Sequence, residues 1–310
     1  MTYSLYLLVI TLCLGPLMSA DGSGKWLIQQ KLSLLRNRYT RVLPIEPFPS
    51  TYQRITAVVI FAVALTTISA SHQLTPIIVV FSLVSLSVVT PLSIRLPILA
   101  ALTLVYWVIY PAAPFTSVYL PEEVSRLGQT LGGVTDKMVD TSKVDKGVAV
   151  VAWAGRALTL GTVLLAMTGF WRRFMWGARD GVVCALVVAP MLILGVTSYG
   201  GEAIFRIFFF SLPFFAFLLG GLLFPSERSS AGHRTSIVFG VLCIALSIGF
   251  LLANNGKDKQ YRFSKDEVAA AVWVYERGGA ETLLVEGARS YPSQFVNYEN
   301  FTYLPIANEA

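Results

Sequence analysis

Charged side chains are scarce in this chain. They make up 14% of its 310 residues, whereas hydrophobic residues make up 55%, and the mean hydropathy is +0.63. A soluble domain normally carries about 25% charged residues, so the composition excludes an ordinary soluble protein. The formal net charge of +6 is not concentrated in a soluble segment. It is therefore typical of loops that lie beside anionic lipid, and it indicates no nucleic-acid partner.

Cysteine is also rare. Cys13, Cys184 and Cys243 stand inside apolar runs and form no CxxC pair. Isolated cysteines in such runs are typical of small buried hydrophobic side chains rather than of disulfides or metal ligands. We therefore expect no metal site, and the sequence identifies no cofactor.

Motifs for nucleotide binding and for the common hydrolases are missing. The sequence has no GxxxxGK[ST], no GxGxxG after a strand, no HExxH and no GxSxG. ATP-driven transport, dinucleotide chemistry, zinc peptidase activity and serine hydrolase activity therefore have no support. No internal repeat of the transporter kind is visible either.

Apolar segments dominate what is present. They cover residues 3–19, 55–70, 76–92, 96–113, 147–170, 181–196, 204–224 and 236–253. Several are short for a bilayer crossing, which needs about 20 residues. We predict an all-α polytopic membrane protein with about eight transmembrane helices over residues 1–253. The pair joined by residues 71–75 can also form a re-entrant hairpin. No basic residue precedes residues 3–19, so we interpret them as a span and not as a secretory signal.

Lysine and arginine fall mainly on one side of this alternation. That side is predicted to be cytoplasmic, because positive residues accumulate there. Residues 25–54 form its most basic stretch, which we interpret as a loop held at lipid headgroups, with a polyanion site as the alternative. The twelve cations of this side are Lys25, Lys31, Arg36, Arg38, Arg41, Arg54, Arg95, Arg172, Arg173, Arg179, Arg228 and Arg234.

The opposite, extracytoplasmic side receives both termini and a polar turn before the seventh segment. The turn consists of Tyr199, Gly200 and Gly201, followed by Glu202 and Arg206. If a helix begins at the glycine pair, Glu202 and Arg206 lie four residues apart on one face and can pair. The pair then either anchors the helix at the membrane interface or recognises a charged substrate. In the second case, the glycines allow a ligand or another backbone to come close.

His72 belongs to the same predicted side, in the sequence SHQLTP. Pro76 favours a helix start there, and Thr75 is predicted to cap it. His72 is either a phosphate ligand or base, or a residue that hydrogen-bonds a helix end.

Arg156 lies nine residues into the 147–170 segment, about 14 Å along a helix axis. An arginine at that depth costs about 3 kcal/mol or more. We expect it either to bind an anion such as lipid phosphate or to pair within the protein.

Asp136 and Asp140, four residues apart in the loop 114–146, are a further candidate pair. Paired carboxylates can bind a divalent cation or act as a base. The lysines that alternate with them are equally typical of a solvated helix.

Residues 254–310 change in composition and predict a small α/β extracytoplasmic tail. Ser264 and Glu267 form a capping box, and Gly278 ends the helix. Residues 282–285 are predicted to be a strand, and residues 297–305 an aromatic loop at a ligand or at the membrane interface.

Five short segments carry a resemblance to a known family. They are SHQLTP (71–76), SYGGEAIFR (198–206) followed by FSLPFF (210–215), FSKDEVAAAVWVYERG (263–278) and NYENF (297–301). In this order they resemble the C-terminal half of large actinobacterial polytopic membrane proteins of the glycosyltransferase-like or O-antigen-polymerase-like kind. The resemblance covers most of residues 55–304. It implies the C-type membrane glycosyltransferase class, a sugar donor linked to polyprenyl phosphate, and chemistry at the outer face.

That class usually carries its catalytic acid in a first large outer loop, and this sequence has no such loop near its start. Two hypotheses follow. The first is a glycosyl or glycan transferase, or its C-terminal half, in cell-envelope assembly; the second is a non-enzymatic partner in lipid or glycan translocation or assembly. In the first, the catalytic candidates are Glu202, Asp136 and Asp140, and the substrate or lipid-phosphate ligands are Arg156, Arg206, His72, Tyr199, Gly200 and Gly201.

Overall fold

The computed structural model describes residues 2–18, 50–118, 146–195, 201–224, 232–255, 263–279, 282–286 and 298–305. These residues are mostly helical. They belong to two compact units, Met1–Ala253 and Asn254–Ala310, each of which is described by itself.

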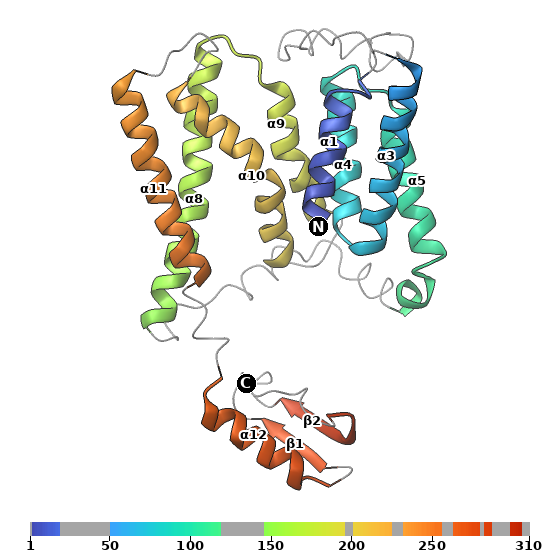
Figure 1. Cartoon of the computed structure of the whole chain (residues 1–310), viewed down its shortest axis with the longest axis vertical. Coiled ribbons are helices and arrows are strands. Elements are labelled where there is room, and N and C mark those ends of the chain that lie inside the picture. The colour runs from blue at the N-terminus through green and yellow to red at the C-terminus, as the bar shows by residue number, and fades with distance from the viewer. Residues whose placement is uncertain are drawn as a thin grey trace. The chain divides into compact units, whose positions relative to one another are not determined.

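Each of the eight apolar segments predicted from the sequence contains a helix of the first unit. Consecutive segments run in alternate directions (Figure 1). The elements are α1 (Thr2–Leu14), α3 (Thr51–Ser71), α4 (Thr75–Val89), α5 (Arg95–Ile109), α8 (Lys146–Met175), α9 (Gly181–Val188), the 3-10 helix η2 (Ala189–Gly195), α10 (Gly201–Leu223) and α11 (His233–Asn255).

Four of these helices are long and apolar enough to cross a membrane: α3, α8, α10 from Ala203, and α11. The helices α1, α4, α5 and α9 with η2 are apolar but shorter. The membrane-helical architecture is thus supported, whereas the crossing of all eight segments stays a prediction.

The short helices end where a proline follows. The steps Gly15–Pro16, Thr90–Pro91 and Tyr110–Pro111 come directly after α1, α4 and α5, and the step Ala189–Pro190 turns α9 into η2. A residue before proline is disfavoured in the α conformation, and proline offers no N–H to the helix. The predicted segments ending at 19, 92 and 113 ran past these breaks and were too long.

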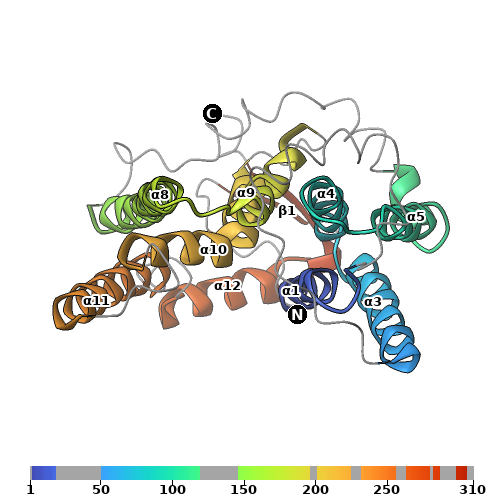
Figure 2. The ribbon, with the colours of Figure 1, turned by 90° about the horizontal axis from the view of Figure 1, so that it is seen from above.

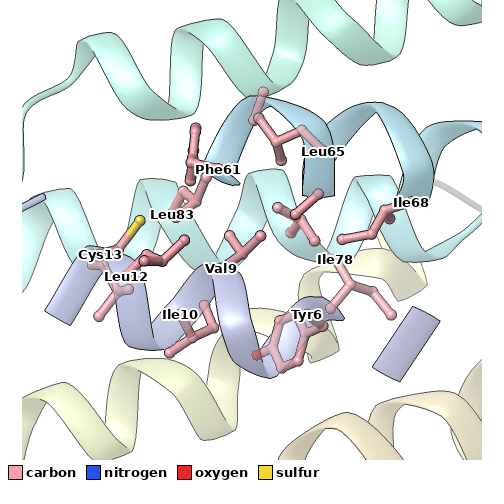
Figure 3. Close-up of a cluster of buried hydrophobic side chains, with 14 of the residues drawn as sticks. Tyr6, Val9, Ile10, Leu12, Cys13, Phe61, Leu65, Ile68, Ile78 and Leu83 are labelled. Atoms are coloured by element: carbon pink, nitrogen blue, oxygen red, sulfur yellow. The ribbon is translucent and has the colours of Figure 1, made fainter. Parts of the chain in front are cut away.

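The larger core of the unit joins α1, α3 and α4 with α9, η2 and the first half of α10. Figure 3 shows its side chains on α1, α3 and α4. Tyr6, Phe61 and Leu83 are fully buried in it. The Tyr6 hydroxyl lies 3.2 Å from Ser82 Oγ on α4, and the Tyr6 ring packs edge-on against Phe210. These contacts tie the start of α10 to α1 and α4.

A second, smaller core joins α8 to the last half of α10 through Ala166, Phe215 and Leu218. Pro213 lies inside α10 between the two cores, and Figure 1 shows the helix bent along its length. A proline in a helix interior removes one hydrogen bond and kinks the helix. The bend lets one helix serve both cores.

The other faces of α8 and α11 are covered by little of the described chain. α11 has no buried residue, and α8 and α11 lie at one side of the helix array, seen end-on in Figure 2. Apolar faces of this kind are suited to lipid. Cys13 is buried as expected, but Cys243 is exposed on α11, so the prediction of burial was wrong for that cysteine.

The second unit contains α12 (Lys265–Arg277), β1 (Thr282–Glu286), a short 3-10 helix (Tyr298–Asn300) and β2 (Phe301–Pro305). The predicted capping box is confirmed: Ser264 Oγ accepts from Glu267 N–H, and Glu267 Oε2 accepts from Ser264 N–H. These bonds lower the pKa of the Glu267 carboxyl below its ordinary value. The helix ends before Gly278 as predicted.

The second strand of this unit was not predicted. β1 and β2 pair in parallel, with Thr282 opposite Phe301, so residues 301–305 are a strand and not the expected loop. The Phe301 ring packs on Tyr275 of α12, with centroids 4.8 Å apart. The aromatic residue therefore fixes the strand against the helix, which is a tertiary contact that local sequence does not reveal.

Candidate functional site

The turn between α3 and α4 is organised by His72. Its Nδ1 accepts hydrogen bonds from the backbone N–H groups of Leu74, at 3.1 Å, and Thr75, at 3.4 Å. The imidazole therefore satisfies N–H groups that a helix start leaves without partners. Of the two roles considered for His72, the hydrogen bond to a helix end is present.

Thr75 does not cap the helix, contrary to the prediction. It is the first residue of α4, the residue before it makes no side-chain cap, and Pro76 lies in the first turn as expected. The Thr75 hydroxyl is fully buried. Among the described residues, it is the buried side-chain polar atom for which no hydrogen-bond partner is found. The imidazole of His72, and not the Thr75 hydroxyl, accepts the hydrogen bonds from the backbone N–H groups at the start of α4.

Arg206 meets His72 from the other side of the turn. Its Nη1 lies 2.5 Å from His72 Nε2, although the two residues are 134 apart in sequence. Ile207 and Phe210, the next residues of α10 toward the core, are buried. Because the helix is held by these neighbours, the position of the Arg206 backbone is fixed, and its half-buried side chain extends to the turn.

The structure thus brings two of the predicted site residues together. α10 begins at Gly201, as required for Glu202 and Arg206 to share a face, but the side chain of Glu202 is outside the described part of the chain. Four further predicted residues lie outside the described ranges altogether: Asp136, Asp140, Tyr199 and Gly200.

Arg156 makes a different contact. It lies on α8 with its guanidinium 5.1 Å from the centre of the Trp153 ring, one turn away on the same helix. A cation over the face of an indole is attracted to it and loses part of its hydration there. The phosphate contact expected of Arg156 stays a prediction.

A second basic cluster, missed from the sequence, lies at the other end of α10. Arg173 binds Asp180 through two parallel bonds, from Nε at 2.6 Å and Nη2 at 2.8 Å, and its guanidinium lies 4.9 Å from the centre of the Phe217 ring. Arg172 Nη1 donates to the carbonyl of Leu222 at 2.6 Å. The last carbonyls of a helix lack partners within the helix and attract cations.

Close helix approach makes this cluster possible. A Cβ atom placed on Gly169 of α8 would lie 1.9 Å from the Leu218 carbonyl oxygen of α10. One placed on Gly221 would lie 2.2 Å from Arg173 Cδ. Only glycine leaves the room that both contacts need. The adjacent arginines and the following aspartate were the available signal, but the sequence analysis assigned the arginines only to the cytoplasmic side and did not consider Asp180.

No group of three or more histidine, cysteine, aspartate or glutamate residues that could hold a metal ion is found in the described ranges. These ranges contain the contact of Arg206 with His72 at one end of α10. At the other end they contain the pair of Arg173 with Asp180 and the bond of Arg172 to the Leu222 carbonyl.

The long apolar helices of the first unit are compatible with an integral membrane protein. No protein-family model matches the chain, and comparison with curated proteins and with solved structures gives no match either. The resemblance to membrane glycosyltransferases consequently stays a prediction.

Proposed function

We propose that this chain is a multi-pass protein of the cell membrane that acts at the outer face on a sugar linked to polyprenyl phosphate. In this proposal it is a glycosyl or glycan transferase of cell-envelope assembly, or the C-terminal half of one, with both termini extracytoplasmic. The supporting observation is the contact between His72 and Arg206 at one end of the apolar helices.

The direction of the helices supports the choice of face. Arg95 and Arg234 stand at the beginnings of α5 and α11, and Arg172 and Arg173 at the end of α8. In the alternating array these ends are opposite to the α3–α4 turn (Figure 1). If the cations mark the cytoplasmic side, the His72 and Arg206 contact is extracytoplasmic.

The chemistry of the contact suits a lipid phosphate. A guanidinium donates two parallel hydrogen bonds to phosphate oxygens, and a helix start adds a favourable field for negative charge. The membrane lipid itself and the polyprenyl carrier are both partners of this chemical kind.

The orientation is tested with reporter fusions. A periplasm-active reporter after Ala310 is expected to be active, and the same reporter within residues 32–41 inactive. Activity of a cytoplasmic reporter after Ala310 would overturn the assignment of the face.

The reaction is tested on the purified full-length chain in nanodiscs, supplied with a sugar linked to polyprenyl phosphate. Release of the polyprenyl carrier and transfer of the sugar are followed by mass spectrometry. The transferase proposal expects turnover that is lost on Glu202→Gln, Asp136→Asn or Asp140→Asn, depending on which acid is catalytic. Binding of the lipid without turnover in the wild-type chain would reject the transferase and favour the non-enzymatic role in translocation or assembly.

A further inference from the structure

One face of α8 carries a stripe of large, exposed side chains. Its members are seven, four, three and four residues apart, a spacing that keeps them on one side of a helix. Each is more than half exposed: Trp153, Leu160, Leu164, Met167 and Trp171. The buried residues of α8 lie on the opposite face and are small: Thr162, Ala166 and Gly169. Ala166 and Gly169 pack on α10, so α8 has a protein-facing side and a side that the described chain leaves open.

Each end of the stripe has a tryptophan and, close to it, an arginine. Trp153 and Trp171 are 18 residues apart in the sequence, about 27 Å along a helix axis. The Arg156 guanidinium lies 5.1 Å from the centre of the Trp153 ring. Its side chain therefore extends toward the start of α8, the direction in which helix side chains lean. At the other end, Arg172 directly follows Trp171. The separation of the two ends is close to the hydrocarbon thickness of a bilayer, about 30 Å.

From this geometry we propose that the stripe of α8 faces lipid hydrocarbon, with Trp153 and Trp171 at the two membrane interfaces and Arg156 among the headgroup phosphates at the first. The crossing then begins near residue 154 and ends near residue 171, so the first two turns of α8 stand outside the hydrocarbon. This differs from the segment 147–170 expected from hydropathy, which places Arg156 inside. The inference requires that α8 crosses a membrane, for which it is long and apolar enough, and it does not depend on the proposed reaction.

Lipid fits the stripe better than a second copy of the chain. Helices that pack on one another in membranes do so through small residues, which let their backbones come close, and α8 uses such residues toward α10. The stripe consists of large side chains instead. Tryptophan is enriched at membrane interfaces, where its ring is partly in hydrocarbon and its N–H group in the polar layer. An arginine near that level extends its guanidinium to the interface, where phosphate oxygens accept from it.

The test measures the depth of the stripe with spin labels on the full chain in phospholipid nanodiscs. Cys184→Ala and Cys243→Ala remove the two cysteines that are not buried, whereas the buried Cys13 stays. A single new cysteine is then placed at an exposed position of α8, Val150 or Leu164, and labelled. Electron paramagnetic resonance compares collisions of each label with oxygen, which concentrates in hydrocarbon, and with a water-soluble nickel chelate. The chain without a new cysteine is the control and should carry no label.

The two labels have different expected depths. With the crossing centred at residue 162, Val150 lies about 18 Å from the centre and Leu164 about 3 Å. We expect the nickel chelate to reach the label at Val150, and oxygen alone to reach the label at Leu164. If residues 147–170 form the crossing, the two positions lie about 13 Å and about 8 Å from its centre, and exclusion of nickel from both labels would overturn the proposal. Nickel access at Leu164 would overturn it in favour of a water-filled cavity. Exclusion of both reagents from Leu164, with spin–spin broadening, would overturn it in favour of a second copy of the chain.

Variants of Arg156 test its place among the headgroups. Arg156→Leu is expected to move the Val150 label toward the hydrocarbon by up to one helical turn, about 5 Å, because no cation then holds this level at the interface. Arg156→Lys should leave the label in place, since lysine also extends its charge to the interface. Arg95→Leu, at the exposed start of α5, is the matched control and should have no effect on the label. An unchanged position in Arg156→Leu, or collapse of its fold as expected for the loss of a partner to a buried carboxylate, would overturn the assignment of Arg156 to the headgroups.

Discussion

The two ends of α10 use arginine in opposite ways. At its last turn, the guanidinium groups of Arg172 and Arg173 meet a carbonyl and a carboxylate, each a good acceptor. At its first turns, Arg206 Nη1 meets Nε2 of His72, whose Nδ1 accepts from the backbone at the start of α4. The first end is thus held by a carboxylate and a carbonyl, and the second meets an imidazole that also caps a neighbouring helix. Charge at a helix end is thus no guide to function until the partner atoms are known.

Gly169→Ala should be the most disruptive change at the complementary end. The new Cβ would lie 1.9 Å from the Leu218 carbonyl oxygen, and a clash with backbone is not relieved by a side-chain rotation. We expect a loss of about 3 kcal/mol, the top of the usual range for overpacking, measured by thermal unfolding in detergent. The control is Gly161→Ala on the same helix, whose Cβ would meet nothing within 4 Å. It should be neutral or stabilise by up to about 1 kcal/mol. Equal effects of the two would mean that α8 and α10 are not in contact at Gly169.

Asp180→Ala should destabilise the same end almost as much. The side chains of Arg173 and Asp180 are only 16% and 9% exposed, so removing the carboxylate leaves a largely buried cation without its two bonds. We expect the free energy of unfolding to fall by about 3 kcal/mol, measured by thermal unfolding in detergent. This is the lower part of the range for a broken buried pair, because Arg173 keeps some solvent contact. The double change Arg173→Met with Asp180→Leu should recover most of this loss. Failure of the double change to recover stability would show that packing and not charge pairing holds this end.

Thr75→Val should have a smaller effect and the opposite sign. Valine has nearly the shape of threonine, and it removes a buried hydroxyl for which no hydrogen-bond partner is found among the described residues, so the free energy of unfolding should rise by about 1 kcal/mol. The measurement is thermal unfolding in detergent, and a loss of stability would indicate that the hydroxyl is already satisfied.

Arg172→Met should have the smallest effect of the four. Arg172 is exposed, and its bond to the Leu222 carbonyl competes with water. We expect a loss of about 0.5 kcal/mol, and the same change at Arg173 should be several times larger. Similar values for the two arginines would contradict the distinction between an exposed cap and a buried pair.

The sequence was sufficient for features that depend on neighbours along the chain. Apolar runs located each helix of the first unit, the glycine pair located the start of α10, and Ser264 with Glu267 located the start of α12. The shortness of four helices was also readable, because a proline follows each. The predicted segments were too long because they followed the apolar residues past the prolines that end the helices.

Features that depend on contacts between distant residues could not be obtained in this way. His72 and Arg206 were each singled out, but nothing in the local sequence indicates that a helix 134 residues later reaches the α3–α4 turn. The same holds for the clamp of Arg173 on Asp180 and for β2, which depends on the contact between Phe301 and Tyr275. A single sequence has no signal for such pairs.

The side-by-side packing of α8 and α10 has a consequence for biosynthesis. Gly169 lies against Leu218 and, further along both helices, Arg173 lies against Gly221, so both helices run in the same direction and α9 with η2 must cross back between them. A ribosome releases the chain from its N-terminus, and α8 is therefore complete before its partner has been made. With 30 residues and an apolar surface, it is long and apolar enough to cross a membrane by itself. The contacts of Gly169 with Leu218 and of Arg172 with the Leu222 carbonyl can form only once α10 has been synthesised, which makes the packing of α8 on α10 a late event in the maturation of the protein.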